Sequence, residues 1–520
     1  MSSLIPLTVF APLVLLAGAS VAPARPGRRP GALPWLSEAA ALAALAFAAA
    51  GLLQLLASGP MQFALFDGPL ALVFRLDPLG ATMTLLVAFI GWIVIRHSRT
   101  HLDGEAREGT FHGLMLATLA AVLSLVQAGS LTVLVLAFVC VGMGLRRLLL
   151  FYAERAAARR AAAKFALVWH AGDAALILAA ALLFAAFGTG ELVAFADPGE
   201  SRLPLAANLA VALLVLAAAL KTAAFPLHGW LTEVMEAPTP VSALLHAGII
   251  NAGGFLLIRT AELVQASPGA MAALVMIGGL TALFGAVVML TQSAVKTSLA
   301  WSTVSQMGFM LLQCGLGLWP LALLHIVAHA MYKAHAFLSA GGAVAAVASL
   351  RRPGPIAVPS LGAVMKSFGL ALALYGAVSL AFTLVAGPKS PQALALGAML
   401  IFGVAYLVAQ GLADAAPVEL TRRTGLAALG AALAYFAFQQ VASALWGQSL
   451  PSAPVVGTLE WALIVLAVFS FGVVAVAQTL FPLWAHHPST AGLRVHIANG
   501  LYLNALLDRV IGGFRTTKSN

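Results

Sequence analysis

The chain has 520 residues, of which 61% are hydrophobic and only 9% charged, and its formal net charge is +10. Soluble proteins contain about 25% charged residues, so this composition excludes a soluble fold. It predicts an all-α polytopic membrane protein, because helices satisfy their backbone polar groups within the bilayer. The two cysteines form no CxxC motif, and neither GxGxxG nor a P-loop is present. This argues against metal and nucleotide sites, and no cofactor is expected in this chain.

About fifteen apolar segments are long enough to span a membrane. The first has no basic residue ahead of it and is interpreted as a membrane helix rather than a cleaved signal peptide. The expected segments are 3–20, 35–57, 77–96, 111–128, 130–151, 164–187, 204–224, 240–258, 269–290, 294–315, 319–347, 366–386, 391–411, 424–443 and 457–478.

The basic residues indicate how these helices are oriented. With the N-terminus outside, most of the 28 Lys and Arg residues fall in inside loops, and only Arg75, Arg202, Arg259 and Lys389 fall outside. This bias predicts a multi-pass inner-membrane protein with a cytoplasmic C-terminus. Residues 494–514 have apolar side chains at helical spacing; they either lie along the cytoplasmic surface, dock a partner, or form a solvated tail.

A lysine inside an apolar segment is the strongest sign of function. Lys221 is followed closely by Pro226. An ionised lysine at the bilayer centre costs roughly 2.5–3.5 kcal/mol, so it needs a partner or a polar pathway. Pro226 removes a helix hydrogen bond and opens polar backbone nearby. We expect Lys221 to load and release a proton; the alternative is a lysine that snorkels from a helix end.

Three more titratable groups share one face of a downstream segment. His325, His329 and Lys333 are spaced i, i+4 and i+8, which places them on one helical stripe. The stripe predicts a proton relay, because a neutral imidazole both donates and accepts hydrogen bonds. A metal site is disfavoured because no HExxH pattern is present. His246, on another apolar segment, is either a further relay group or a structural hydrogen-bonding residue.

The other candidate residues are less specific. Lys296 enters a hydroxyl-rich helix and either bridges two halves of a polar axis or anchors that helix at the cytoplasmic surface. His170 and Asp173 are spaced i, i+3 and would tune the first lysine through space. Glu233 and Glu236 either guard a cytoplasmic entrance or are solvated.

Two lysines among helix breakers suggest an internal repeat. Lys221 and Lys389 both lie beside prolines, and inverted repeats with interrupted helices in matching positions are typical of transporters. The predicted units are N-terminal helices (1–110), a first repeat (111–258), a second repeat (269–411), and C-terminal helices with a cytoplasmic tail (424–520).

Four motifs resemble those of the antiporter-like membrane subunits of respiratory complex I and of Mrp-type cation/proton antiporters. The resemblance implies two inverted five-helix repeats with broken helices around a hydrated axis. It also implies that Lys221 and Lys296 are key lysines and that His246, His325 and His329 connect them. The motifs are Lys221-x4-Pro226-Leu-His-x-Trp230, Pro238-Thr-Pro240-Val-Ser-Ala-Leu-x-His246-Ala, Lys296-x3-Ala-x-Ser302-Thr-x-Ser305-Gln306 and His325-x3-His329-Ala-x2-Lys333-Ala.

The chain departs from that family at two points. The family carries a glutamate on its fifth helix that pairs with the first lysine, but residues 138–145 contain no acid here. Asp173, Glu233 and Glu236 are the candidates to replace it. Lys389 matches the lysine of the second broken helix, yet the chain after it is too short to complete that helix.

Within this superfamily, residues 233–240, 251–255 and 495–502 most resemble the DabB membrane subunits of DAB inorganic-carbon accumulation complexes. The resemblance implies a DabA-like peripheral zinc protein as partner, which would supply the zinc and the catalysis. The predicted function is a non-enzymatic subunit that conducts protons or sodium ions and energises CO2/bicarbonate accumulation. The alternatives are a proton-pumping subunit of an NADH dehydrogenase or hydrogenase complex, an Mrp-type sodium/proton antiporter, and a membrane anchor.

Overall fold

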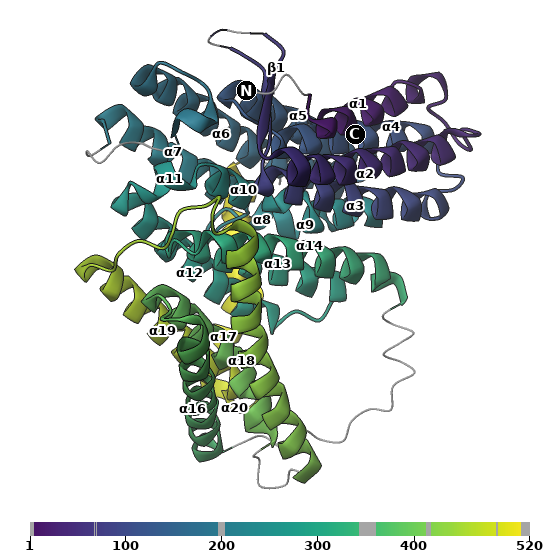
Figure 1. Ribbon diagram of the computed structural model, residues 1–520. Coiled ribbons are helices and arrows are strands. Elements are labelled where there is room, and N and C mark those ends of the chain that lie inside the picture. The colour runs from purple at the N-terminus through teal and green to yellow at the C-terminus, as the bar shows by residue number, and fades with distance from the viewer. Residues whose placement is uncertain are drawn as a thin grey trace.

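The computed structural model describes residues 5–66, 68, 70–195, 203–342, 360–411, 418–484 and 487–510, which form an almost entirely helical structure (Figure 1). Twelve helices in these segments are long and apolar enough to cross a membrane. The three remaining expected spans are also helices. Two of them contain shorter apolar helices, Leu205–Lys221 and Pro391–Ala405. The third, Val295–Gly315, is rich in hydroxyl and amide side chains. The predicted all-α polytopic membrane fold is confirmed.

The N-terminal helices form one layer of the bundle (Figure 1). They are α1 (Phe10–Ala19), α2 (Leu33–Ser58) and α3 (Pro78–His101), and α1 and α2 pack on each other. An antiparallel hairpin of β1 (Met61–Ala64) and β2 (Val73–Leu76) connects α2 to α3.

A buried charge cluster ties this hairpin to the rest of the bundle. Asp77 caps α3 by accepting a hydrogen bond from the Gly80 backbone N–H at 2.6 Å. Its other carboxylate oxygen lies 2.5 Å from Arg259 Nη1 and 2.8 Å from Arg75 Nε. Burial raises the pKa of the Asp77 carboxyl, but Arg259 and Arg75 outweigh it and hold the pKa below its ordinary value.

The helices that correspond to the predicted first repeat surround a broken helix. They are α4 (Glu108–Val126), α5 (Leu131–Leu149), α6 (Ala156–Phe187), α7 (Leu205–Lys221), α8 (Gly229–Thr232), α9 (Thr239–Ala247) and α10 (Ala252–Arg259). As predicted, α7 ends at Lys221, and the chain resumes a helix only at Gly229. The short 3-10 helix η4 (Val234–Glu236) connects α8 to α9.

The following helices differ from the prediction in one respect. They are α11 (Ala261–Gln265), α12 (Pro268–Met289), α13 (Val295–Gly315), α14 (Trp319–Ser339), α16 (Leu361–Ala386) and α17 (Pro391–Gly411). The expected second broken helix is not found in the described residues, because α17 runs without interruption from Pro391. Lys389 lies ahead of it, in the connection from α16.

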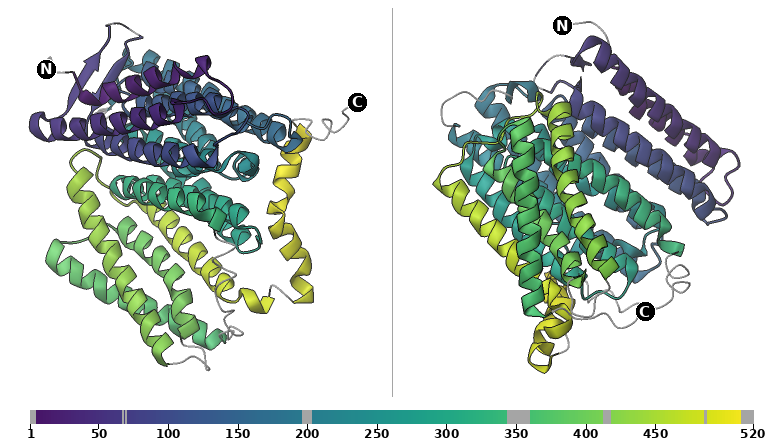
Figure 2. Two further views of the ribbon diagram at one scale, coloured as in Figure 1. Left: turned by 90° about the vertical axis from the view of Figure 1, so that its right-hand side faces the viewer. Right: turned by 60° about the horizontal axis from the view of Figure 1, so that its bottom comes forward.

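The C-terminal region has two parts. The helices α18 (Val418–Trp446) and α19 (Thr458–Thr479) pack with α16 and α17 as a group beside α12–α14 (Figure 1). After α20 (Phe481–Trp484), residues 488–510 form α21 (Ala491–Ala498), the 3-10 helix η8 (Gly500–Tyr502) and α22 (Leu503–Val510). We call residues 488–510 the C-terminal strap. It crosses the ends of the spanning helices, on the side opposite the N-terminus (Figure 2, left).

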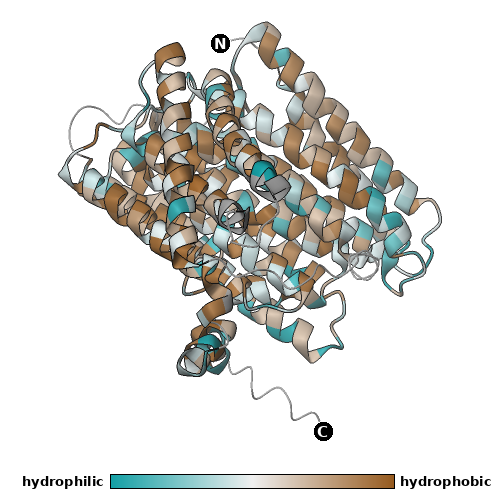
Figure 3. Cartoon of the chain, turned by 90° about the horizontal axis from the view of Figure 1, so that it is seen from below, coloured by the Kyte–Doolittle hydropathy of each residue, from teal (hydrophilic) through white to brown (hydrophobic). Residues whose placement is uncertain are grey.

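Hydropathy follows this arrangement. The spanning helices are mainly hydrophobic along their length, and hydrophilic residues gather in the connections and near the C-terminus (Figure 3). Large apolar side chains are exposed on the outer helices, among them Leu384, Val385 and Phe469. These side chains are suited to contact with lipid.

Candidate functional site

Lys221, at the end of α7, is bound to an acid on α6. Its Nζ lies 2.5 Å from Asp173 Oδ1 and 3.5 Å from the Trp169 carbonyl oxygen. The other carboxylate oxygen of Asp173 lies 3.1 Å from His170 Nδ1. The Lys221 side chain is fully buried, whereas the His170 side chain is 44% exposed. The three residues therefore connect an accessible imidazole to a buried ammonium.

Aromatic rings enclose the rest of the ammonium. Lys221 Nζ lies 4.7 Å from the ring centroid of Phe138 and 4.2 Å from that of Trp169. Ring faces attract cations, most strongly when water is excluded. The lysine side chain also packs along α6, since a Cβ at Gly172 would lie 3.4 Å from its Cε and Cγ, an ordinary van der Waals contact. The site holds a single cation next to one carboxylate.

This geometry shows which acid contacts the first lysine. Where α5 comes nearest to Lys221, it contributes the ring of Phe138 and no carboxylate. Of the three candidate acids, Asp173 alone among the described residues contacts Lys221. Glu233 pairs with Lys164, and Glu236 lies 3.3 Å from Arg155. The sequence analysis expects Asp173 to tune Lys221 through space. In the structure, the two residues form a direct ion pair.

Lys164 is a buried cation, which the sequence analysis places only as the first residue of the expected segment 164–187. It lies inside α6, which begins at Ala156 rather than at 164, and its side chain is fully buried. Its Nζ lies 2.6 Å from Glu233 Oε1 and 2.7 Å from both Asn504 Oδ1 and Asp508 Oδ1. No local pattern reveals this burial, since two of the three partners come from the C-terminal strap.

The predicted stripe on α14 points into the protein. Lys333 Nζ donates to Ser302 Oγ at 2.9 Å and to the Leu299 carbonyl at 3.1 Å. One turn earlier, His329 is buried, and neither ring nitrogen has a hydrogen-bond partner among the described residues. The ring of His325 follows at 6.1 Å between centroids. The helical spacing read from the sequence therefore forms one polar row.

His246, on α9, joins this row through α13. Its Nδ1 lies 3.1 Å from Thr303 Oγ1, and its ring stacks on Phe337 at 4.3 Å. Thr303 is the neighbour of Ser302, which binds Lys333. Two adjacent hydroxyls of α13 thus connect a residue of α9 with a residue of α14, a role that the sequence analysis missed although both lie in a quoted motif.

The two other lysines that the sequence analysis names as candidates lie outside the buried polar groups. Lys296 is half-buried at the start of α13, where its Nζ donates to Thr239 Oγ1 at 3.3 Å. This position corresponds to the anchoring alternative for Lys296. Lys389 is half-buried in the α16–α17 connection. Among the described lysines of the second half of the chain, Lys333 is the one that is fully buried.

Close helix packing joins α7, which ends at Lys221, to α10, which follows the His246 helix. Gly253 of α10 lies so near α7 that a Cβ would meet the Ala218 carbonyl oxygen at 2.6 Å and Thr222 Cγ2 at 2.7 Å. Thr222 Oγ1 bonds back to that same carbonyl at 2.8 Å. Helices α7 and α10 are therefore in contact beside Lys221, without room for a side chain at position 253.

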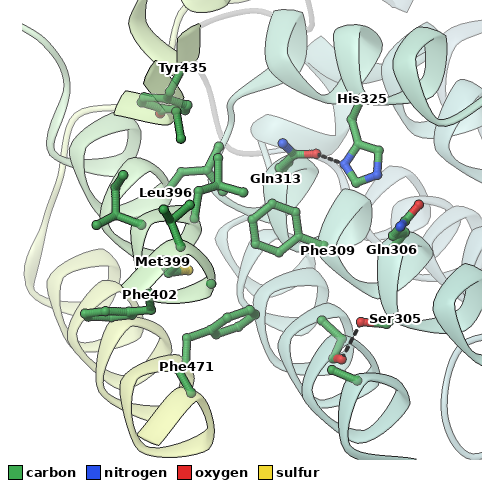
Figure 4. Close-up of a pocket in the computed structure, with 18 of the residues that line it drawn as sticks. Ser305, Gln306, Phe309, Gln313, His325, Leu396, Met399, Phe402, Tyr435 and Phe471 are labelled. Carbon is green, nitrogen blue, oxygen red and sulfur yellow. Dashed lines mark hydrogen bonds between the residues drawn. The ribbon is translucent and has the colours of Figure 1, made fainter. Parts of the chain in front are cut away.

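The polar row ends at a cavity of about 700 Å³. Its walls come from α12–α14 on one side and from α17–α19 on the other. In Figure 4, His325 and Gln313 lie at one wall, joined by a hydrogen bond of 2.8 Å, and face apolar residues such as Leu396 and Phe471. His325 is thus the group of the row that borders open space.

Sequence comparison gives consistent relatives. A family described as "NADH:quinone oxidoreductase/Mrp antiporter, TM" matches residues 128–355. The chain is 36% identical over 460 residues to "Probable inorganic carbon transporter subunit DabB2" of Halothiobacillus neapolitanus, covering 85% of this chain and 80% of that protein. It is 43% identical over 266 residues to "Probable inorganic carbon transporter subunit DabB" of Hydrogenovibrio crunogenus, covering 50% and 51% of the two chains.

Structural comparison supports the same fold. The chain is similar to a chain of the Mrp complex from Dietzia sp. DQ12-45-1b, with a TM-score of 0.65 and 24% sequence identity. The match covers 99% of this chain and 60% of that one.

Proposed function

We propose that this chain, which belongs to the NADH:quinone oxidoreductase/Mrp antiporter transmembrane family and within it to the DabB group of inorganic carbon transporter subunits, conducts protons or sodium ions to drive inorganic-carbon accumulation. The observation that carries the proposal is the ion pair of Lys221 and Asp173 inside the bundle. Isolating such charges from water costs several kcal/mol per ion. A protein that needed only stability would fill this site better with apolar residues.

The first half of the pathway runs from a partly exposed residue to a buried one. His170 is partly exposed, Asp173 binds it, and Lys221 lies at the buried end. A proton taken up by the imidazole moves to the carboxylate, and its arrival frees the ammonium from its counter-charge. Lys221 can then pass a proton or displace a cation further inward.

The second half offers hydrogen-bonding groups at short intervals. Lys333 and Ser302 lead to His329, whose two ring nitrogens and the Nε2 of His246 are buried without a partner among the described residues. Buried polar atoms of this kind bind ordered water. A water chain along them would end at His325 and the cavity, from which the ion leaves.

The energy for carbon uptake would come from the membrane. One charge moving through 100 mV releases about 2.3 kcal/mol, so one or two ions per cycle are enough to bias hydration of CO2 to bicarbonate. We propose that a peripheral, zinc-containing, carbonic-anhydrase-like partner performs the hydration. This chain contributes the ion path and no reacting group. It lies in the inner membrane, with its C-terminus on the cytoplasmic side.

The decisive experiment substitutes Lys221→Ala in cells that depend on the complex for growth at low CO2. Carbon accumulation is expected to stop, while Lys366→Ala, which removes an exposed lysine of α16, leaves it unchanged. Normal accumulation with Lys221→Ala would refute ion conduction as the driving step.

A respiratory or Mrp-type role is the second candidate, because the matching family includes both kinds of subunit. Purification of the full chain from native membranes in mild detergent separates the two. A single large zinc-containing soluble protein supports the carbon complex. Flavin, quinone-site or iron–sulfur subunits would instead identify a respiratory machine, and several small membrane subunits an Mrp-type antiporter.

A further inference from the structure

The C-terminal strap packs Ile497 and Leu507 against the core and also turns polar side chains inward. Within α22, Asp508 is buried against Lys164, and Asn504 binds both Lys164 and Glu233. By contrast, Leu506 is 55% exposed and Val510 79% exposed. An amphipathic helix at a protein surface normally buries its apolar side. This orientation of α22 leaves Leu506 and Val510 on a face that no described residue covers.

The strap is held firmly in this orientation. The Gln292 side chain donates to the Ala498 carbonyl at 3.2 Å. Gly500 has a φ of +57° and packs against Trp301, so that a Cβ would lie 3.2 Å from the indole ring. Leu501 and Tyr502 also have positive φ values of 53° and 58°. Non-glycine residues in this conformation cost of order 1–3 kcal/mol each and persist only where contacts enforce them.

The exposed apolar side chains lie along one continuous stretch of chain. Each of them is at least 41% exposed in the described structure. They are Leu493, Val495, Leu501, Tyr502, Leu506 and Val510. Exposed apolar side chains that gather on one segment are typical of an interaction site.

The position of the strap favours a protein over lipid. The outer sides of the spanning helices are suited to lipid, whereas the strap crosses the helix ends and rests on α6, α8 and the α12–α13 connection (Figure 2, left). The exposed side chains therefore face the solution beyond the membrane. Arg159 and Arg509 are exposed near the same end, which adds a basic rim to the apolar face.

We infer that the outward face of the C-terminal strap is the docking surface for a water-soluble peripheral protein that presents an apolar patch bordered by carboxylates. The inference rests on the proposed function only in that the chain works as a subunit of a complex. Because Glu233 and Asp508 share Lys164, a partner that binds the strap touches the same network that closes the bundle beneath it.

Site-specific photocrosslinking in native membranes tests the docking surface. A benzoylphenylalanine replaces Leu506 in the full chain, and the control replaces Leu70, which is 70% exposed in the β1–β2 connection on the opposite side. Light is expected to join position 506, but not position 70, to one soluble protein. Crosslinks from position 506 only to lipid, only to another copy of this chain, or to nothing would overturn the inference.

A second variant tests the same surface without crosslinking. Leu506→Glu together with Val510→Glu is expected to lower retention of that same protein at least tenfold in a detergent pull-down. The elution volume of the full chain should stay unchanged. Undiminished retention would overturn the inference. If the crosslink is found and Lys221→Ala still leaves carbon accumulation normal, the surface stands and the proposed function falls.

Discussion

Asp173 on α6 holds Lys221 at the end of α7 with a separation of 2.5 Å. Phe138, the nearest contribution of α5, covers the ammonium with its ring. A carboxylate partner for the first lysine thus comes from the sixth helix of this chain, while the fifth supplies an apolar wall. The predictions below begin from this pair.

Removing the carboxylate should disable and destabilise the site. Asp173→Asn leaves Lys221 buried without a counter-charge, and breaking a buried pair in this way costs about 3–5 kcal/mol. Ion flux in proteoliposomes and the melting temperature in detergent should both fall. The matched control is Glu236→Gln, whose pair with Arg155 is half exposed and contributes about 1 kcal/mol or less. Equal effects of the two variants would contradict the assigned role.

A carboxylate placed on α5 should replace the Asp173 carboxylate of α6. Phe138→Glu in the Asp173→Asn background returns a carboxylate to within reach of the same ammonium, because the ring it replaces is centred 4.7 Å from Lys221 Nζ. Flux should recover in part. The single variant Phe138→Glu gives the reference, since it adds an acid beside an intact pair. No recovery in the double variant would mean that Asp173 acts through His170 rather than through its charge alone.

The two lysines of the second half should differ in importance. Lys333 is buried and bound to Ser302, whereas Lys296 is half-buried at a helix start. Loss of a positioned proton-transfer group slows transfer by roughly 100-fold or more, so Lys333→Ala should reduce flux by that order. Lys296→Ala should have a much smaller effect. Comparable losses would restore Lys296 as a pathway residue, as the family resemblance implies.

Acid should selectively weaken the hairpin anchor outside the membrane. The pKa of Asp77 in the folded protein lies below its ordinary value, so the ionised carboxylate stabilises the fold at pH values above about 3.9, the usual aspartate pKa. That contribution is lost as the pH falls through the lowered pKa. The difference in melting temperature between the natural chain and Asp77→Asn should be constant near neutral pH and shrink only below about pH 4. A difference that disappears near pH 6 would exclude this carboxylate as its source.

Helix contact beside the Lys221 group should not tolerate a methyl group. Gly253→Ala places a Cβ 2.6 Å from the Ala218 carbonyl oxygen, and overpacking of this kind costs typically about 1–3 kcal/mol. Gly369→Ala in α16 is the control, because nothing lies within 4 Å of its Cβ position. The first variant should melt at a lower temperature than the natural chain and the second should not.

Local patterns in the sequence determined much of this protein. Long apolar runs specify the helices because backbone groups must be satisfied inside the bilayer. The i, i+4, i+8 spacing of His325, His329 and Lys333 places them on one face because a helix has a fixed period. Proline and polar residues after Lys221 end α7 there. Each of these features depends on neighbours within a few turns of one segment.

Only the tertiary structure decided which charges meet. Asp173 and Lys221 are 48 positions apart, and Lys164 and Asn504 are 340 apart. The sequence offers three acids for Lys221 and no partner for Lys164, since nothing local distinguishes a buried cation from a solvated one. Helix packing makes the choice: it brings α6 against α7 and lays the strap across α6. Once water is excluded there, each buried ammonium requires the carboxylate that packing has placed beside it.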